Sequence, residues 1–329
     1  MIDTIYIERE VAAHPETLRV LQRFPRARRI EIDRYGEIFN RRAQSFRLQK
    51  LRPALILARK HDRFVLEAPA EYGVGGEHNY YFSHLLNCIY DCRYCFLQGM
   101  YRSANYVYFV NLEEFERAID EALARHPGEP VYFFSGYDCD SLALDGVTGF
   151  AGRALDFFAE RPGGWLELRT KSVRTRALLE RSPLTNVIVA MSFTPESVHG
   201  ALEHGVPAVE RRLCALAELG RRGWPLGLRF DPLIYFDGYA DAYRALFDQI
   251  AECLDRGWLH SVCFGSFRLP KPFFDRVRAQ YPDEALFAGP LEQCGNLISY
   301  RSDLERQMRA FCAEELAARW PAERLFACQ

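Results

Sequence analysis

The chain has no long apolar run, and this absence excludes a membrane-spanning helix from its expected architecture. No stretch among its 329 residues reaches the 18 or more apolar positions that such a helix needs. It also shows no signal peptide, so we expect a reduced, cytoplasmic protein whose cysteines are free of disulfides. The formal net charge is only −2, which gives no overall preference for nucleic acid. With 49% hydrophobic and 26% charged residues, the chain is typical of a globular protein.

The charge is nevertheless distributed unevenly. Between residues 21 and 65, thirteen basic residues stand against four acidic ones, which gives this segment a net charge of +9. Such a surface suits the phosphates of DNA. A solvated, arginine-rich surface without a ligand is the alternative, and the sequence leaves both open.

Cysteine is plentiful, and three of the ten cysteines fall within eight positions. Cys88, Cys92 and Cys95 have the spacing C-x3-C-x2-C. Three thiolates from one short loop can hold three irons of a [4Fe–4S] cluster and leave the fourth iron open. Structural zinc is the alternative, but it usually needs four ligands, and no second C-x2-C pair follows. The loop resembles that of radical S-adenosylmethionine (SAM) enzymes, in which the cluster cleaves SAM to a 5′-deoxyadenosyl radical.

From residue 80 onward, short apolar segments alternate with amphipathic ones. This pattern predicts an α/β fold, a partial (β/α)6 barrel of parallel strands, with a small N-terminal α/β region before it and a C-terminal extension after it. We place the domain boundary between residues 1–79 and 80–329, with a glycine-rich linker over 72–79. The expected barrel strands cover 80–86, 131–134, 166–170, 186–191, 226–230 and 261–264.

Polar residues at the ends of these strands are candidates for an active site, because the carboxyl ends of parallel strands meet at one edge of a barrel. Besides the three cysteines they are Tyr137, Asp138, Cys139, Asp140, Ser141, Thr170, Lys171, Ser192, Thr194, Arg229, Asp231, Ser266 and Arg268. Such residues also cap helices. Lys171 is the stronger candidate, because a lysine that ends an apolar strand rarely caps the next helix.

Several segments resemble the spore photoproduct lyase family, whose members are radical SAM enzymes that repair a thymine–thymine lesion in DNA. The matching segments are 5–11 (IYIEREV), 92–98 (CRYCFLQ), 106–114 (YVYFVNLEE), 170–171 (TK) and 223–227 (GWPLG). The resemblance extends over nearly the whole chain. It implies a hydrogen abstraction from a thymine-dimer lesion, with DNA as partner and a reducing protein such as flavodoxin or ferredoxin as electron donor.

The resemblance also implies roles for individual residues. Cys88, Cys92 and Cys95 would hold the [4Fe–4S] cluster. Lys171 and Ser192 would contact the carboxylate and ribose of SAM, and Tyr94 would lie beside the adenosyl group. Ser141, at the end of the second strand, is a further candidate for contact with SAM.

The chain departs from the family pattern at the residues that are expected to transfer the hydrogen atom. The family's segment after the second strand reads roughly C-T-S-D, and its cysteine returns a hydrogen atom to the product. Here the segment is Tyr137-Asp138-Cys139-Asp140. The donor is then Cys139 from a shifted loop, or Tyr137, or the product is not quenched in this way. Phe96 replaces the tyrosine after the last cluster cysteine, which breaks the family's tyrosine relay.

Two further segments concern the substrate. Arg229 and Asp231 stand where the family is apolar, which predicts a more polar substrate or a structural salt bridge. The segment 295–301 (GNLISYR) loosely resembles the family's lesion-probing hairpin, so Tyr300 and Arg301 are predicted to stack on and clamp a flipped lesion. A radical SAM enzyme acting on another nucleotide, a modified nucleic acid or a metabolite is the first alternative function. A non-catalytic DNA-binding iron–sulfur protein is the second.

Overall fold

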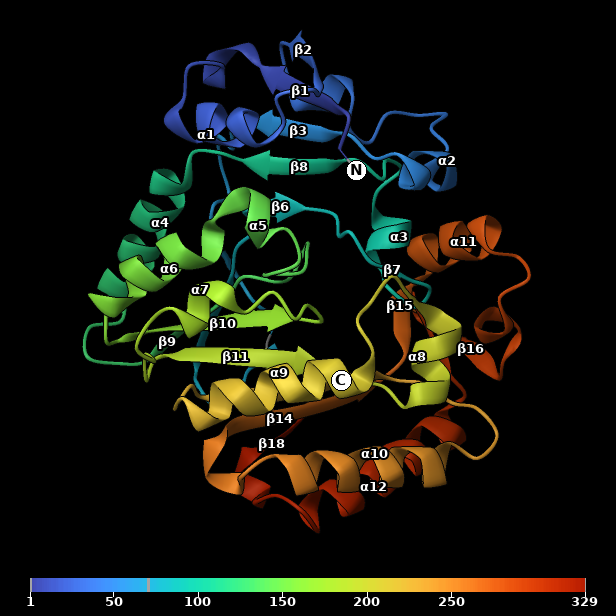
Figure 1. Cartoon of the computed structure of the whole chain (residues 1–329). Helices are drawn as coiled ribbons and strands as arrows, with labels where there is room; N and C mark the ends of the chain where they lie inside the picture. The colour runs from blue at the N-terminus through green and yellow to red at the C-terminus, as the bar shows by residue number, and fades with distance from the viewer. Residues whose placement is uncertain (1, 70–71, 329) are drawn as a thin grey trace.

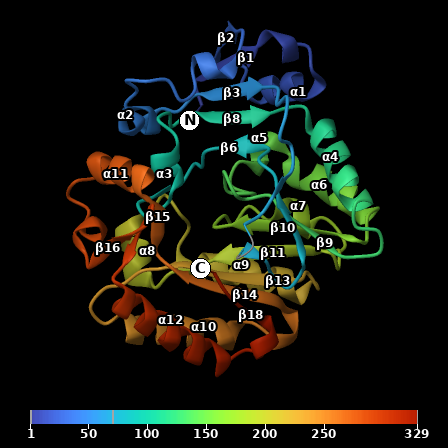
Figure 2. The ribbon, with the colours of Figure 1, turned by 180° about the vertical axis from the view of Figure 1, so that it is seen from behind.

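The structure is a computed structural model that describes residues 2–69 and 72–328. A five-stranded N-terminal sheet lies at the top of Figure 1, and a large curled sheet with its helices fills the lower part. The same arrangement is seen from behind in Figure 2. None of the helices in the described residues is both long and apolar enough to cross a membrane.

The large sheet has eight strands in the order β18-β14-β13-β11-β10-β9-β5-β4. Its six central strands are β5 (His78–Tyr81), β9 (Val131–Phe134), β10 (Gly164–Thr170), β11 (Val187–Ser192), β13 (Leu226–Leu233) and β14 (Leu259–Ser266). All neighbouring pairs among these six run parallel. At the edges, β4 (Leu66–Glu67) is antiparallel to β5, and β18 (Leu325–Ala327) is parallel to β14. The predicted partial barrel of six parallel strands is confirmed.

Helices cover the outer face of this sheet. They are α4 (Leu112–Ala124), α6 (Phe150–Ala159), α7 (Arg176–Leu179), α9 (Val209–Arg221), α10 (Tyr239–Cys253) and α12 (Ser302–Ala317). Helix α9 shows why they pack there. Its buried residues Val209, Leu213, Leu216 and Leu219 recur every three or four positions and form one apolar stripe.

The apolar run 80–86, predicted as one strand, is divided between two sheets. Strand β5 ends at Tyr81, and β6 (Leu85–Leu86) pairs antiparallel with β8 (Tyr106–Phe109). Between them Ser83 donates a hydrogen bond to Asp138, and the buried His84 ring stacks on Phe150. The apolar pattern alone predicts one strand here, because a sequence pattern does not show that the chain passes from one sheet to another.

The N-terminal sheet has the order β2-β1-β3-β8-β6. It contains β1 (Thr4–Glu8), β2 (Arg28–Ile32) and β3 (Leu55–Ala58), accompanied by helices α1 (Pro15–Arg23) and α2 (Phe46–Leu51). Strands β6 and β8 come from beyond residue 80. The N-terminal region and the barrel therefore share one hydrogen-bonded sheet across the expected boundary.

The remaining elements lie near the carboxyl ends of the barrel strands, on the right of Figure 1. They are β7 (Asp91–Cys92), α3 (Leu97–Met100), β12 (Glu203–His204), β15 (Arg268–Pro270), α11 (Lys271–Gln280), β16 (Leu291–Cys294) and β17 (Leu297–Tyr300). Strands β15, β17 and β16 form a small antiparallel sheet within the C-terminal extension. Two short helices also lie away from the outer face of the large sheet: α5 (Asp145–Thr148) contacts α1, and α8 (Glu196–Leu202) lies near β15 and β16 on the right of Figure 1.

A buried ion pair links strands across the barrel. Arg229 on β13 donates to both carboxylate oxygens of Glu167 on β10, at 2.6 and 3.1 Å. Its guanidinium also donates to the carbonyl and hydroxyl oxygens of Ser261 on β14, and both charged side chains are at most 1% exposed. All this places Arg229 in the wall of the barrel and away from the cavity described below. The predicted substrate contact of Arg229 gives way to a structural salt bridge, made with Glu167 and not with Asp231.

Replacing Glu167 by glutamine is expected to lower the free energy of unfolding by about 3–5 kcal/mol, because it leaves the Arg229 charge buried without a counter-charge. Chemical denaturation followed by circular dichroism measures this loss. Asp241→Asn, which removes the exposed partner of Arg244, is the matched control and should leave stability nearly unchanged. Equal losses of unfolding free energy in the two variants would contradict the assignment of Glu167 and Arg229 as a buried ion pair.

Candidate functional site

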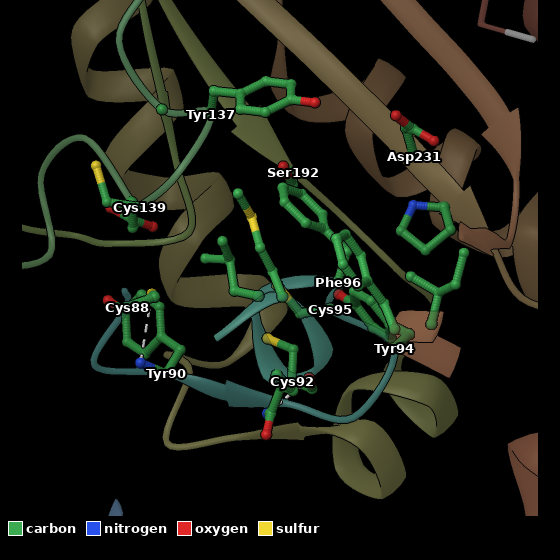
Figure 3. A pocket seen from close by; sticks show the side chains of 18 of the residues that line it. Cys88, Tyr90, Cys92, Tyr94, Cys95, Phe96, Tyr137, Cys139, Ser192 and Asp231 are labelled. Carbon is green, nitrogen blue, oxygen red and sulfur yellow. Dashed lines mark hydrogen bonds between the residues drawn. The ribbon is translucent and has the colours of Figure 1, made fainter. Parts of the chain in front are cut away.

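A cavity of about 650 Å³ opens at the carboxyl ends of the barrel strands. Figure 3 shows side chains from several strand ends and from the cysteine loop pointing into it. The predicted site residues among its lining are Cys88, Cys92, Tyr94, Cys95, Tyr137, Cys139, Asp140, Thr170, Lys171, Ser192, Asp231, Ser266 and Arg268. The structure thus brings together most of the residues predicted from strand ends.

The three cysteines lie on one side of this cavity (Figure 3). Two sulfurs on a single zinc ion are at most about 4.6 Å apart, since the Zn–S bond is about 2.3 Å. Among the residues that the structure describes, the triads whose ligand atoms all lie within 4.8 Å of one another do not include these cysteines. At least two of the three sulfurs are therefore farther apart than two ligands of one zinc ion would be. The donor set therefore fits the [4Fe–4S] cluster that the sequence predicts.

Burial controls the protonation of these thiols. It raises the pKa of Cys88 to about 12 and the pKa values of Cys92 and Cys95 above their ordinary value. Metal binding would therefore have to displace protons from the thiols. The backbone N–H of Tyr90 already points at the Cys88 sulfur, at 3.4 Å, where it would stabilise a thiolate.

The cysteine loop is held on two sides by distant segments. Lys50 on α2 donates through Nζ to the carbonyl oxygens of Cys88 and Tyr90, at 2.5 and 2.9 Å. Gln98 donates to the Cys92 carbonyl at 3.0 Å and accepts from the hydroxyl of Tyr281 at 2.8 Å. These contacts fix the backbone that carries the ligands, and sequence reasoning missed Lys50 because only the folded chain brings it to the loop.

Lys171, Ser192 and Tyr94, the residues predicted to contact SAM, come together at the cavity. The Lys171 ammonium lies 5.6 Å from the centre of the Tyr94 ring. Ser141 does not join them, because its hydroxyl bonds to that of Ser135 at 2.8 Å and the residue is buried behind the lining.

Glu203 is a buried acid that contacts Tyr94 and Lys171. Sequence reasoning missed this residue. Its carboxylate accepts hydrogen bonds from the Tyr94 hydroxyl and from Arg212, the latter at 2.7 Å. His199 lies at 3.1 Å and the Lys171 ammonium at 3.9 Å. Burial alone would raise the pKa of Glu203, but the neighbouring cations and hydrogen bonds lower it to about 2. No local motif marks this residue, because β12 reaches the cysteine loop only through its antiparallel pairing with β7.

Tyr137 and Cys139, the two candidate hydrogen-atom donors, are oriented differently. The Tyr137 ring lies 4.3 Å from the ring of Tyr81 and 5.6 Å from that of Phe96. Burial raises the pKa of Tyr137 to about 12, so its phenol keeps its hydrogen at neutral pH. In Figure 3 the sulfur of Cys139 points away from the cluster cysteines. That thiol donates to the carbonyl of Ser135 at 3.7 Å.

One wall of the cavity is charged. Asp231 pairs with Arg268 at 3.1 Å, and Arg268 also donates to the hydroxyl of Tyr72 at 3.0 Å. Arg169, at the end of β10, lines the same cavity. Of the two strand-five residues predicted to meet the substrate, only Asp231 therefore reaches the cavity.

The hairpin formed by β16 and β17 presents a different residue from those predicted. Tyr300 is only 2% exposed, and its hydroxyl accepts from the backbone N–H of Tyr235 at 2.8 Å. Arg301 is exposed at the start of α12, 3.5 Å from Asp303. Leu297, which is 41% exposed, lines the cavity instead. The predicted stacking and clamping roles of Tyr300 and Arg301 do not fit these positions.

Replacing Glu203 by glutamine is expected to lower the free energy of unfolding at pH 7 by about 3 kcal/mol, which corresponds to a pKa lowered from 4.5 to about 2. Because the folded-state pKa lies below the unfolded one, this stabilisation is complete above pH 4.5 and is lost as the pH falls toward 2. Denaturant titrations from pH 7 down to about pH 2 measure it.

The control for Glu203→Gln is Glu196→Gln, which changes an exposed acid on the preceding helix α8. That variant should match the unmodified chain at every pH. A difference between Glu203→Gln and the unmodified chain that fails to narrow below pH 4.5 would contradict the buried, ionised state of Glu203.

Comparison with known proteins bears on this geometry. The family model described as spore photoproduct lyase matches residues 76–288. Spore photoproduct lyase of Bacillus subtilis (strain 168) is 26% identical to the chain over 202 residues, and that of Geobacillus sp. (strain Y412MC61) is 25% identical. Each alignment covers 60% of this chain and 59% of the relative, so the chain matches about three fifths of the length of these relatives.

Solved structures extend the likeness in fold to the whole chain. A spore photoproduct lyase mutant with bound AdoMet and dinucleoside spore photoproduct has a TM-score of 0.85, and spore photoproduct lyase complexed with the dinucleoside alone has 0.84. Both comparisons cover 100% of this chain and 98% of the other, at 18% identity. The N-terminal sheet, the barrel and the C-terminal extension thus have the same arrangement in these proteins.

Proposed function

Because the chain belongs to the spore photoproduct lyase family, we propose that it is a radical SAM enzyme that repairs a spore-photoproduct-type thymine lesion in DNA. One observation carries the proposal. The cysteine loop, Lys171, Ser192 and Tyr94 surround a single cavity at the ends of the barrel strands. A cluster, SAM and a substrate must share such a cavity if a radical made from SAM is to reach the substrate directly.

Residues on one wall of the cavity would bind the cluster and SAM, and residues on the other wall would bind the lesion. Cys88, Cys92 and Cys95 would hold the [4Fe–4S] cluster, which supplies the electron for reductive SAM cleavage when bound. Lys171 offers a positive charge to the carboxylate of SAM. Tyr94, fixed by its hydrogen bond to Glu203, borders the adenosyl position.

The opposite wall would receive the lesion. Leu297 from the hairpin supplies apolar contact, and Asp231 with Arg268 supplies hydrogen-bonding groups for the polar edges of the bases. Related proteins support this assignment, since the solved spore photoproduct lyase structures hold a dinucleoside spore photoproduct.

We assign the return of the hydrogen atom to Tyr137. The product radical takes the hydrogen of the phenol, so that a C–H bond forms, the O–H bond breaks and a phenoxyl radical remains on Tyr137. Phe96 has no hydroxyl through which a hydrogen atom could pass back toward SAM. The phenoxyl is therefore reduced by one electron from the reducing partner and one proton from water. One SAM is consumed for each lesion repaired.

The charged wall favours a second candidate function. Arg169, Asp231 and Arg268 give this cavity more charge than two stacked thymines need. A radical SAM reaction on another nucleotide or a modified nucleic acid would use these groups. The same assay separates the two functions.

The first test is an anaerobic assay with the reconstituted cluster, SAM, dithionite and dinucleoside spore photoproduct. We expect 5′-deoxyadenosine together with loss of the lesion to thymidines. Cys92→Ala should lose iron and SAM cleavage, whereas Cys214→Ala, an exposed cysteine on α9, should retain both. Deoxyadenosine without repair would favour the second candidate function. An intact cluster that leaves SAM uncleaved would contradict both functions.

The second test concerns the hydrogen donor. Tyr137→Phe is expected to lower the yield of repaired thymidines at least about tenfold while SAM cleavage continues, because the ring remains and only the transferable hydrogen is lost. Cys139→Ala should keep most of the repair, and the ratio of deoxyadenosine to lesions repaired should stay near one. Loss of repair in Cys139→Ala but not in Tyr137→Phe would assign the donor to the thiol.

A further inference from the structure

Helix α2 contacts the cysteine loop on one side and solvent on the other. On its inner side, Lys50 holds the carbonyl oxygens of Cys88 and Tyr90, and Phe46 lines the cavity together with Lys50. Both ribbon views show α2 at the periphery, near α3 and α11 (Figures 1 and 2). On this side of the cysteine loop, only α2 lies between the backbone of Cys88 and Tyr90 and solvent, and a helix with its side chains is about 10–12 Å across.

The outer side of α2 is apolar. Leu48 and Leu51 are 69% and 78% exposed, and their spacing of three residues places them next to each other on the helix surface. They are the two most exposed large hydrophobic side chains in the described part of the molecule. Apolar surface rimmed by polar residues marks interaction sites when it is contiguous, and these two neighbouring leucines form one continuous apolar surface.

Positive charge flanks this pair. Arg52, directly after Leu51, has an 82% exposed side chain, although it pairs with Asp3 at 3.7 Å. Arg47 and Arg41 donate to the backbone carbonyls of Gln280 and Glu37, contacts that leave their charges unneutralised. Arg42, in the loop that leads into α2, is exposed as well. The apolar pair therefore lies within a basic surround, which attracts an acidic partner and repels a basic one.

We propose that the outer side of α2, with Leu48, Leu51 and these arginines, is the docking surface for an acidic one-electron carrier of the flavodoxin type. This inference rests on the proposed function, because only a redox-active cluster on the loop needs an external electron. In each encounter the flavin hydroquinone of the carrier loses one electron and becomes a semiquinone. The three cysteines would hold the cluster that accepts this electron.

The size and position of the surface suit this partner. Electron-transfer complexes are weak and bury small areas, so one short helix with two apolar side chains is sufficient. Complementary charge speeds the encounter. DNA is the competing occupant, since leucines can also wedge between base steps and arginines bind phosphate. The contact between α2 and the cysteine loop favours the electron carrier, because electron transfer requires proximity to the cluster.

The test compares Leu48→Glu/Leu51→Glu with Leu18→Glu, which changes an exposed leucine on α1. Oxidised flavodoxin is titrated into each reconstituted full-length protein under anaerobic conditions, with calorimetry as the readout. The double variant should bind at least about tenfold more weakly, and Leu18→Glu should match the unmodified chain. Cluster reduction by flavodoxin hydroquinone, followed by electron paramagnetic resonance, should slow in parallel.

Dithionite separates this inference from the proposed function. It is a small reductant that needs no docking surface, so dithionite-driven SAM cleavage should be equal in all three proteins. Failure of SAM cleavage with dithionite in the unmodified chain would refute the proposed function and leave the binding comparison intact. Circular dichroism checks the fold, and Leu48→Ser/Leu51→Ser replaces the double glutamate variant if that variant misfolds.

Three outcomes would overturn the docking assignment. The first is equal affinity of the double variant and the unmodified chain for flavodoxin. The second is a loss of affinity for a duplex oligonucleotide with flavodoxin binding unchanged, which would assign α2 to DNA. The third is that the unmodified chain fails to bind flavodoxin and an acidic ferredoxin alike.

Discussion

The geometry of the cavity depends on the hydrogen bonds that the carboxylate of Asp140 accepts. This carboxylate accepts hydrogen bonds from the backbone N–H groups of Leu142, Ala143 and Lys171 and from the hydroxyl of Thr170. Burial raises the pKa of this acid, and the four donors oppose that rise by stabilising its charged form. The loop after β9 is thereby joined to the end of β10. Tyr137, before Asp140, and Lys171 consequently face the same cavity.

The cysteine loop depends in the same way on segments that are far apart in the chain. Lys50 holds its backbone from the N-terminal region, Tyr281 supports it through Gln98 from the C-terminal extension, and Glu203 anchors Tyr94 from the middle of the barrel. Short loops do not hold three ligands rigidly by themselves. The position of the cysteine loop therefore depends on contacts from the N-terminal region, the barrel and the C-terminal extension together.

Local patterns predicted the residues whose role follows from their place in the chain. The cysteine spacing, the six strands and the polar ends that include Lys171 and Ser192 could be identified because each signal lies within a few residues. Glu203 and Leu297 could not, since their positions arise from long-range pairing. Arg229 shows that a sequence pattern does not predict the direction in which a charged side chain points. A sequence identifies a charge at a strand end, but only packing decides that it turns toward Glu167 inside the barrel and not toward the cavity.

Two departures from the family pattern, Tyr137 and Phe96, lie next to each other at the cavity. Lys171, Ser192 and the cysteines, the residues expected to bind the cluster and SAM, keep the identities that the family resemblance implies. Tyr137 and Phe96 differ, and they lie against each other with their ring centres 5.6 Å apart. Phe96 lacks the hydroxyl of the family's tyrosine relay, and Tyr137 carries a phenol where the resemblance implies a thiol, so both changes concern the return of the hydrogen atom. In the proposed reaction, the residues expected to bind the cluster and SAM therefore match the family pattern, and the residues expected to return the hydrogen atom differ from it.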